Sequence, residues 1–170
     1  MSVETTIAPA SRTVPPNDVR DLPLDAVDRM LIEALQRDAR TPNNALAALA
    51  GIAPSTALGR VRSLVDRGVI RGFHADVDPA ALGRNLEAMI SVRLQAHARK
   101  HQVFTERMTQ LDEVLDVYFI AGADDYLLHV AVASAHRLRD FVIEHLGADP
   151  EVAGTETTLI FEHMRRRSAD

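Results

Sequence analysis

The chain has 170 residues, 46% of them hydrophobic and 25% charged, and a formal net charge of −5. This composition is typical of a soluble globular protein with one large or two small domains. The absence of cysteine excludes disulfides, thiolate metal sites and cysteine nucleophiles. No apolar run approaches the roughly 20 residues of a membrane span, and no secretory signal opens the sequence, so we expect a cytoplasmic protein.

The sequence begins with a segment, residues 1–21, that is rich in Ser, Thr, Pro and Ala and poor in large apolar residues. We expect it to be a disordered tail. The segment Leu24–Asp38 then has helical periodicity, with Asp25 and Asp28 near its start, where the helix dipole favours negative charge. Its apolar residues share one face of the helix: Val27, Leu31, Ala34 and Leu35.

Two more amphipathic helices are predicted on either side of a turn at Gly51. The first covers Asn43–Ala50, with Pro42 in its first turn and Thr41 as its N-cap, and the second runs from Pro54 to Gly68. The residues predicted to face inward are Leu46, Leu49 and Ala50 in the first helix, and Ala57, Val61, Leu64 and Val65 in the second. A strand over Val69–Phe73, with Arg71 facing out, would complete a winged helix-turn-helix domain at residues 22–76.

The stretch from Thr41 to Asp76, which holds both helices and the predicted strand, suggests a partner, and that partner is double-stranded DNA. Between Ile52 and Ala75 four arginines face one aspartate, so this stretch is +3 (four minus one) in an acidic chain. Arginines bind phosphates or guanine, and hydroxyls reach phosphates or base edges. The candidate DNA-binding residues are Pro54, Ser55, Thr56, Leu58, Arg60, Arg62 and Arg71. The alternative is an ordinary amphipathic helix pair, which is common in helical domains.

The second half of the chain, after a linker at residues 77–85, contains both strand and helix periodicities. Strands are predicted over Leu86–Ala96, Val114–Ala121, Tyr126–Ala133 and Val152–Met164, and helices over Lys100–Leu111 and Ala135–Leu146. The helix residues predicted to face inward are Val103, Phe104, Met108 and Leu111, then Leu138, Phe141, Val142 and Leu146. This β-α-β-β-α-β order is ferredoxin-like.

The fold class is therefore α+β, with an N-terminal winged helix-turn-helix followed by a ferredoxin-like domain at residues 86–164 and a basic tail at 165–170. Helices cover one face of such a sheet, and we expect a second copy of the chain to cover the other and form a homodimer. Residues 78–170 hold ten basic and fifteen acidic side chains, and so carry the whole net charge of −5. We expect this half to serve assembly or sensing away from the DNA.

The chain resembles the Lrp/AsnC (feast/famine) family of transcriptional regulators from about Leu24 to Met164. The resemblance rests on LDxxDRMLIEALQRDAR at Leu24–Arg40 and LAALAGIAPSTALGRVRSLVDRGVIRGFHADVDPAALG at Leu46–Gly83, with AGADDYLLHVAV at Ala121–Val132 and VAGTETTLIF at Val152–Phe161. It implies an N-terminal domain that binds DNA. It also implies a C-terminal domain that dimerises, assembles dimers into larger rings of up to an octamer, and binds an amino acid as effector.

The resemblance places the effector site near the loop between the second and third strands, at a contact between subunits. The matching residues are Gly122, Asp124, Asp125 and Tyr126, joined by Thr155 and Thr157 on the last strand. An aspartate would accept hydrogen bonds from the ammonium group of an amino acid, and the backbone near Gly122 would approach its carboxylate. The alternative is that Gly-Ala-Asp-Asp is an ordinary turn between strands.

Other kinds of site are not expected. The seven histidines have no spacing that would align them on one metal ion, so we expect no metal site and no cofactor. The sequence has no phosphate-binding glycine loop and no nucleophile elbow, which argues against an enzyme. The sequence thus predicts an amino-acid-responsive, DNA-binding regulator. The alternatives are an effector-independent architectural protein that coats DNA and a sensor that does not bind DNA.

Overall fold

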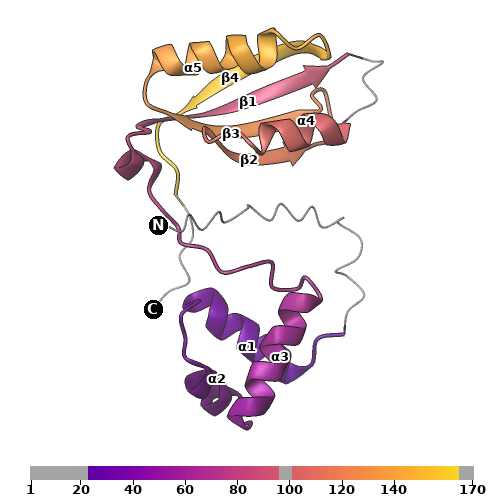
Figure 1. Ribbon diagram of the computed structural model, residues 1–170, viewed down its shortest axis with the longest axis vertical. Helices are drawn as coiled ribbons and strands as arrows, with labels where there is room; N and C mark the ends of the chain where they lie inside the picture. Colours follow the sequence, from indigo (N-terminus) through magenta and orange to yellow (C-terminus); the bar gives the residue numbers. More distant parts are fainter. Residues whose placement is uncertain (1–22, 96–100, 165–170) are drawn as a thin grey trace, which may run out of the picture. The chain divides into compact units, whose positions relative to one another are not determined.

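The computed structural model describes residues 23–95 and 101–164, so the predicted tails at residues 1–21 and 165–170 lie outside the described residues. The described chain divides into two compact units on either side of the Ala75–Asp76 bond. Figure 1 shows three helices in the first unit and a sheet with helices in the second. None of the described helices has the length and apolar content needed to cross a membrane.

The first unit consists of α1 (Ala26–Arg37), α2 (Asn43–Ala50) and α3 (Pro54–Asp66). A capping box starts α1, because Asp25 accepts a hydrogen bond from the backbone N–H of Asp28 at 2.8 Å and Asp28 accepts one in return. The core contains Leu31 and Leu35 of α1, Leu46 of α2 and Leu64 of α3. The predicted inner faces of α1 and α3 are confirmed.

Two details predicted for α2 are wrong. Pro42 is its N-cap and Thr41 makes no cap, because the Thr41 hydroxyl donates to the carbonyl of Asp38 at 2.7 Å instead. Leu49 is 64% exposed, whereas Ala47 is 2% exposed. The buried stripe of this short helix runs through Leu46, Ala47 and Ala50, and with about 100° of rotation per residue Leu49 falls beyond its edge.

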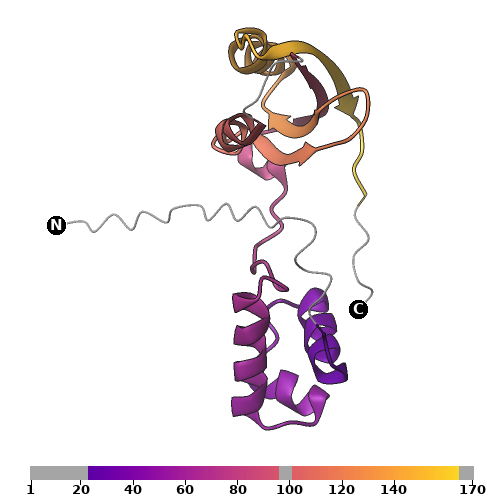
Figure 2. The same cartoon turned by 90° about the vertical axis from the view of Figure 1, so that its right-hand side faces the viewer.

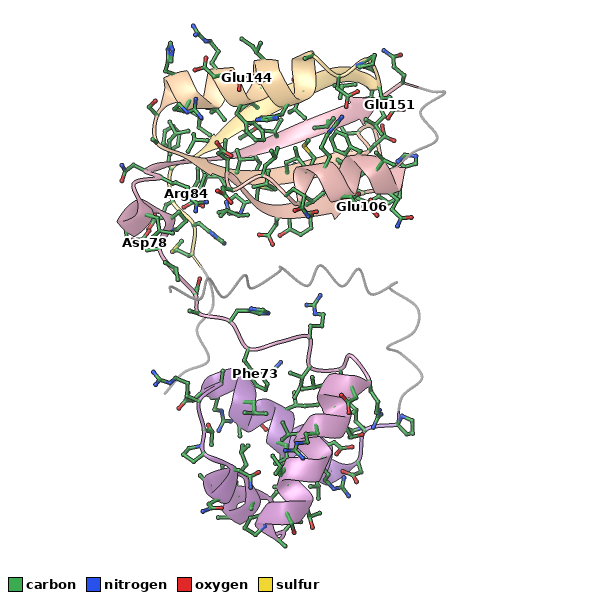
Figure 3. All side chains as sticks on the ribbon, in the orientation of Figure 1. Phe73, Asp78, Arg84, Glu106, Glu144 and Glu151 are labelled. Carbon is green, nitrogen blue, oxygen red and sulfur yellow. The ribbon has the colours of Figure 1, made fainter. Side chains whose placement is uncertain are left out.

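The turns that follow α2 and α3 depend on glycines with positive φ. Gly51 has a φ of 65°, and Gly68, just after α3, has a φ of 72°. The predicted strand over Val69–Phe73 does not form. Instead Ile70 donates its N–H to the carbonyl of Leu64 and packs against the core. A strand needs a partner for its backbone groups, and among residues 23–75 no strand is described that could provide one. Phe73, labelled in Figure 3, lies on this segment and is 48% exposed.

The second unit begins with a 3₁₀ helix, η1 (Pro79–Leu82), capped by Asp78. The elements that follow confirm the β-α-β-β-α-β order: β1 (Leu86–Leu94), α4 (His101–Met108), β2 (Val114–Phe119), β3 (Tyr126–Val132), α5 (Ala135–Phe141) with its π-helical continuation η2 (Val142–Gly147), and β4 (Val152–Ile160). The strands form an antiparallel sheet in the order β2-β3-β1-β4. Figure 2 shows both helical segments on the same face of this sheet.

Alternation along β1 separates the two faces of the sheet. The helix-covered face carries the buried residues Ala88, Ile90, Val92 and Leu94. They pack against Phe104 and Met108 of α4 and against Leu138, Phe141 and Leu146 of α5 and η2. Val103 was predicted to face inward but is 51% exposed, because it lies one residue, or about 100° of helix rotation, from the buried Phe104. The opposite face of β1 carries Glu87, Met89, Ser91 and Arg93; we call the whole uncovered side of the sheet the open face.

Candidate functional site

The start of α3 presents an uncapped helix end. Its N-cap is Ala53, which has no side chain able to accept a hydrogen bond, and Pro54 occupies the first turn. The next two residues, Ser55 and Thr56, are exposed. The first N–H groups of a helix lack intrahelical partners and carry the positive end of the helix dipole, so this end favours an anion such as a phosphate.

The rotation of α3 about its axis is set by contacts on its other side. Ala57 and Leu64 are buried, and the side-chain amide of Asn43 on α2 donates to the carbonyl of Pro54 at 2.8 Å. This arrangement turns the remaining residues of the first turns outward. Of the predicted DNA-binding residues on α3, the structure exposes Pro54, Ser55, Thr56, Leu58 and Arg62 together.

Arg60 does not share this exposed face. Its Nη1 lies 2.5 Å from Asp25 and 2.9 Å from Asp28, which is 7% exposed. Hydrogen bonds to these two carboxylates raise the pKa of Arg60 above its ordinary value. The pKa of Asp25 is lowered, first by the backbone N–H of Asp28 and then by the Arg60 guanidinium. The sequence indicated a nucleic-acid contact for Arg60, but in the structure its charge is used to join α3 to the start of α1.

Arg62 and Arg71 keep their charges available. Both are exposed, and among the hydrogen bonds and ion pairs of residues 23–95 and 101–164 neither side chain has a partner. With Arg60 paired to α1, the basic island retains Arg62, Arg67 and Arg71 against Asp66, a charge of +2 (three minus one). Arg71 was predicted on a strand over Val69–Phe73, the wing of the domain. Because that strand does not form, Arg71 lies instead on an irregular segment after α3.

The predicted effector residues do not form one cluster. Tyr126 is 1% exposed, packs against Phe104, and donates its hydroxyl hydrogen to the carbonyl of His101 at 2.8 Å. The hydroxyl also accepts a hydrogen bond from Thr105, and burial raises the pKa of Tyr126. Tyr126 is thus a core residue, with no exposed surface to offer a ligand.

Asp125 is also used within the fold. Its carboxylate accepts a hydrogen bond from the backbone N–H of Leu94 at 2.7 Å, and its own N–H donates to the carbonyl of Val92 at 3.0 Å. These bonds fasten the turn between β2 and β3 to β1. Asp124 is different, because no hydrogen bond or ion pair engages its side chain in the described parts of the chain. A side chain at Gly122 would meet open space.

The two threonines lie on β4, the edge strand furthest from β2 in the sheet. Thr155 of β4 pairs with Val92 of β1, which in turn pairs with Tyr126 of β3. Neighbouring strands are about 4.8 Å apart, so two strand spacings, about 10 Å, separate Thr155 from Tyr126. Thr157 lies one row further along β4, opposite Ile90. A shallow cavity lined by Arg84, Glu113 and Arg137 contains none of the predicted effector residues.

Sequence reasoning missed one residue beside the turn, His101. Its ring lies 4.9 Å from that of Phe119 and 6.1 Å from that of Tyr126, and its Nδ1 atom is buried without a hydrogen-bond partner among the described residues. Phe119, the last residue of β2, is 64% exposed. No local pattern marks His101, because only the pairing of β2 with β3 and the packing of α4 bring these rings together.

A helix-turn-helix unit with an exposed hydroxyl- and arginine-bearing helix, followed by a ferredoxin-like unit, defines a class of two-domain transcriptional regulators. Residues 24–65 match the AsnC-type helix-turn-helix domain and residues 87–170 match the Lrp/AsnC ligand binding domain. The chain is 57% identical over 155 residues to the HTH-type transcriptional regulator AldR of Mycobacterium tuberculosis, covering 91% of this chain and 87% of that protein. The chain therefore belongs to the Lrp/AsnC family of DNA-binding transcriptional regulators, which are not enzymes.

Further relatives and solved structures agree with this assignment. The leucine-responsive regulatory protein of Rhizobium meliloti is 34% identical over 144 residues, covering 84% of this chain and 92% of that protein. The crystal structure of MtbAldR superposes with a TM-score of 0.74 at 51% identity, covering 86% of this chain and 100% of that chain. Escherichia coli AsnC gives a TM-score of 0.75 at 28% identity, covering 87% and 99%. The predicted fold class and family are confirmed.

Proposed function

We propose that this regulator binds specific DNA sites in the cytoplasm through the exposed start of α3, as a homodimer or larger oligomer whose affinity changes when an amino acid binds. The observation that carries the proposal is the combination of an uncapped helix N-terminus, exposed residues Ser55 and Thr56, and Arg62 on the same side of α3 with no side-chain partner among the described residues. Backbone N–H groups and hydroxyls suit phosphates, and an arginine fork suits guanine.

Each part of this surface would contact DNA in its own way. Ser55 and Thr56 would bind phosphates or base edges, and Pro54 and Leu58 would lie against the major groove. Arg62 would contact a base or a phosphate, and Arg71 would contact the backbone beyond the end of α3. A twofold dimer would place two α3 helices in successive major grooves, about 34 Å apart, which favours palindromic sites.

The effector would bind at the turn between β2 and β3. Asp124 offers a carboxylate to the ammonium group of an amino acid, Gly122 leaves space for close approach, and His101 and Phe119 lie beside the same turn. Support also comes from the match to a ligand binding domain and from the name of the leucine-responsive relative. Thr155 and Thr157 would take part only through a second copy of the chain, because two strands separate them from this turn within one chain.

The open face of the sheet would provide the dimer contact. Both helical segments lie on the other face (Figure 2), and the open face carries Tyr118, which is 46% exposed, beside partly buried Met89 and Leu127. A sheet with one uncovered face gains stability when apolar area on that face is removed from water.

Titration of a labelled DNA duplex tests the proposal. The duplex carries the region upstream of this protein's own gene, the control is a scrambled duplex of the same length, and anisotropy is read with and without a mixture of the twenty amino acids. We expect tighter binding to the upstream duplex and a change in its affinity with the mixture. Equal binding to both duplexes would contradict sequence-specific recognition.

One observation favours a second function, that of an effector-independent architectural protein. Asp125 and Tyr126, two of the predicted effector residues, are engaged within the fold. Such a protein would bind both duplexes cooperatively, and the amino acids would leave its affinity and its sedimentation on DNA unchanged.

A further inference from the structure

We propose that Glu87, His129 and His163 form a binding site for a divalent transition-metal ion on the open face of the sheet. One potential ligand atom from each residue lies within 4.8 Å of the other two. Glu87 lies on β1, His129 lies on β3, and His163 follows the end of β4. All three residues belong to the second unit of one chain, so one chain supplies all three ligands. They lie on the open face, which is also the face proposed above as the dimer contact.

The register of the sheet brings the first two ligands together. His129 pairs with Met89, and Glu87 lies two residues before Met89 on the same face, which makes Glu87 and His129 diagonal neighbours. Nε2 of His129 lies 2.8 Å from the Glu87 carboxylate. β4 runs beside β1 and ends at Ile160, next to Glu87. The chain then brings the ring of His163 to 5.8 Å from that of His129, edge towards face.

A second carboxylate prepares His129 to bind a cation. Its Nδ1 lies 3.5 Å from Oδ2 of Asp116, on the side of the ring opposite Glu87. A neutral imidazole has a single N–H, so it can donate to only one of two carboxylates. In the ion-free structure the hydrogen bond of His129 runs from Nε2 to the Glu87 carboxylate. A cation at Nε2 would displace that hydrogen, and Asp116 would then accept one from Nδ1. In many metal sites a carboxylate accepts the other N–H of a metal-binding histidine in this way and so fixes the orientation of the ring.

The ligand set indicates which ions would fit. Two imidazoles and one carboxylate suit Zn²⁺ and its neighbours, whereas Mg²⁺ and Ca²⁺ prefer oxygen ligands alone. With bond lengths of about 2.0–2.2 Å, ligand atoms in a tetrahedral site lie about 3.3 Å apart. The ligand atoms of Glu87 and His129 are already near that separation. The exposed His163 lies on a segment outside any helix or strand, so small shifts of this segment would bring its ring nitrogen to bonding distance of the same ion. The fourth position would hold water.

The sequence predicted no metal site, because the spacing of histidines was judged along single elements. The three ligands come instead from two strands and the segment after a third, and one of them is a glutamate. A bound ion would join β1 and β3 to residues 161–164. It would thereby hold this segment, in which Phe161 is 97% exposed, against the sheet.

The test is a Zn²⁺ titration of the full-length, tag-free protein after removal of metal with a chelator, with a chromophoric chelator as competitor. The absence of cysteine leaves no thiolate to compete. We expect a single tight Zn²⁺ site per chain and, with Co²⁺, visible absorption typical of a tetrahedral ion. His163→Gln and Glu87→Gln should abolish both. Asp116→Asn should weaken Zn²⁺ binding by about 10–100-fold, because it removes the carboxylate that orients the His129 ring.

The matched control is His136→Gln. His136 is an exposed histidine of α5 whose Nε2 lies 3.6 Å from Asp140, so it has a carboxylate neighbour but belongs to no cluster of three ligands. This variant should bind Zn²⁺ like the parent protein. His163→Gln should lose the rise in unfolding temperature that Zn²⁺ produces in the parent protein.

Two outcomes would overturn the proposal. If the parent protein binds no Zn²⁺ in competition with the chelator, His129 serves only as a hydrogen-bonded residue between two carboxylates. If Zn²⁺ binds but His163→Gln and Glu87→Gln leave its affinity unchanged, the ion binds elsewhere.

Discussion

Nη1 of Arg60 lies 2.9 Å from a carboxylate oxygen of Asp28, a residue of α1 that is 7% exposed. This contact joins the middle of α3 to the first turn of α1, and Asp25 supports it from the N-cap. Arg60 of the proposed DNA-binding helix is therefore engaged in a contact between α1 and α3. The direction in which α3 presents its exposed face depends on this ion pair as well as on apolar packing.

Arg60→Met and Asp28→Asn should both lower the unfolding temperature of the first unit. The first leaves the poorly solvated Asp28 carboxylate without its partner, and the second removes one of the two carboxylates that bind Arg60. Both should weaken DNA binding by a similar factor, and the double variant should be no worse than the worse single variant, since the two residues act through one contact. Thermal unfolding and DNA titration of the four proteins give this cycle. If Arg60→Met weakens DNA binding and Asp28→Asn does not, then Arg60 contacts DNA directly.

Asp25 gives the same region a dependence on pH. In the folded chain the pKa of Asp25 is lowered below its ordinary value of 3.8, first by the N–H of Asp28 and then by Arg60. A carboxylate with a lowered folded pKa stabilises the fold above its unfolded pKa, and that stabilisation is lost as the pH falls through the folded value.

Asp25→Asn should therefore unfold at a lower temperature than the parent protein at pH 7, and the difference should shrink below about pH 4. Asparagine is also a good N-cap, so the variant tests the charge rather than the cap. Unfolding temperatures of both proteins between pH 7 and pH 2.5 provide the measurement, with Asp66→Asn as a control for removing one negative charge from the same unit. A difference that does not depend on pH would show that the Asp25 charge contributes nothing.

Leu46 and Leu49 form a matched pair on α2. Leu46 is 4% exposed and Leu49 is 64% exposed. Leu46→Ala should lower the free energy of unfolding of the first unit by about 2–5 kcal/mol, because it leaves a cavity in the core. Leu49→Ala should change it by less than about 0.5 kcal/mol. Urea unfolding followed by circular dichroism distinguishes them, and equal losses would show that Leu49 is buried in solution.

Tyr126→Phe tests whether this residue belongs to the core or to the effector site. Phenylalanine keeps the ring but removes the hydroxyl that bonds His101 and Thr105. We expect a loss of about 0.5–1.5 kcal/mol in the free energy of unfolding of the second unit, with an unchanged response of DNA binding to amino acids. Lost response with unchanged stability would instead make the hydroxyl a ligand contact.

Local periodicity was sufficient to predict most of the fold. Alternation from Leu86 to Leu94 identified the buried face of β1, and the helical spacing of Leu31 and Leu35 identified that of α1. Errors of local prediction occurred in short elements, such as α2 with Leu49, and where a strand over Val69–Phe73 had no partner to bond.

The site was less predictable, because the sequence indicates which residue types are present but not which partners they meet. Arg60 lies 32 residues from Asp28, and His129 lies 42 residues from Glu87. Neither contact leaves a local pattern. Tyr126 matched the position expected for a ligand contact, yet the packing of α4 makes it a core residue.

Arg62 tests most directly whether the exposed face of α3 binds DNA. The measurement is the affinity of Arg62→Ala for the upstream duplex over a range of salt concentrations. The control is Arg139→Ala, which removes an exposed arginine from α5.

Arg62→Ala should weaken binding by about 1–3 kcal/mol if Arg62 contacts a base, or reduce the salt slope by about one if it contacts a phosphate. Arg139→Ala should bind like the parent protein. If Arg62→Ala binds the duplex with unchanged affinity and salt dependence, this face of α3 does not contact DNA, which contradicts the proposed DNA-binding surface.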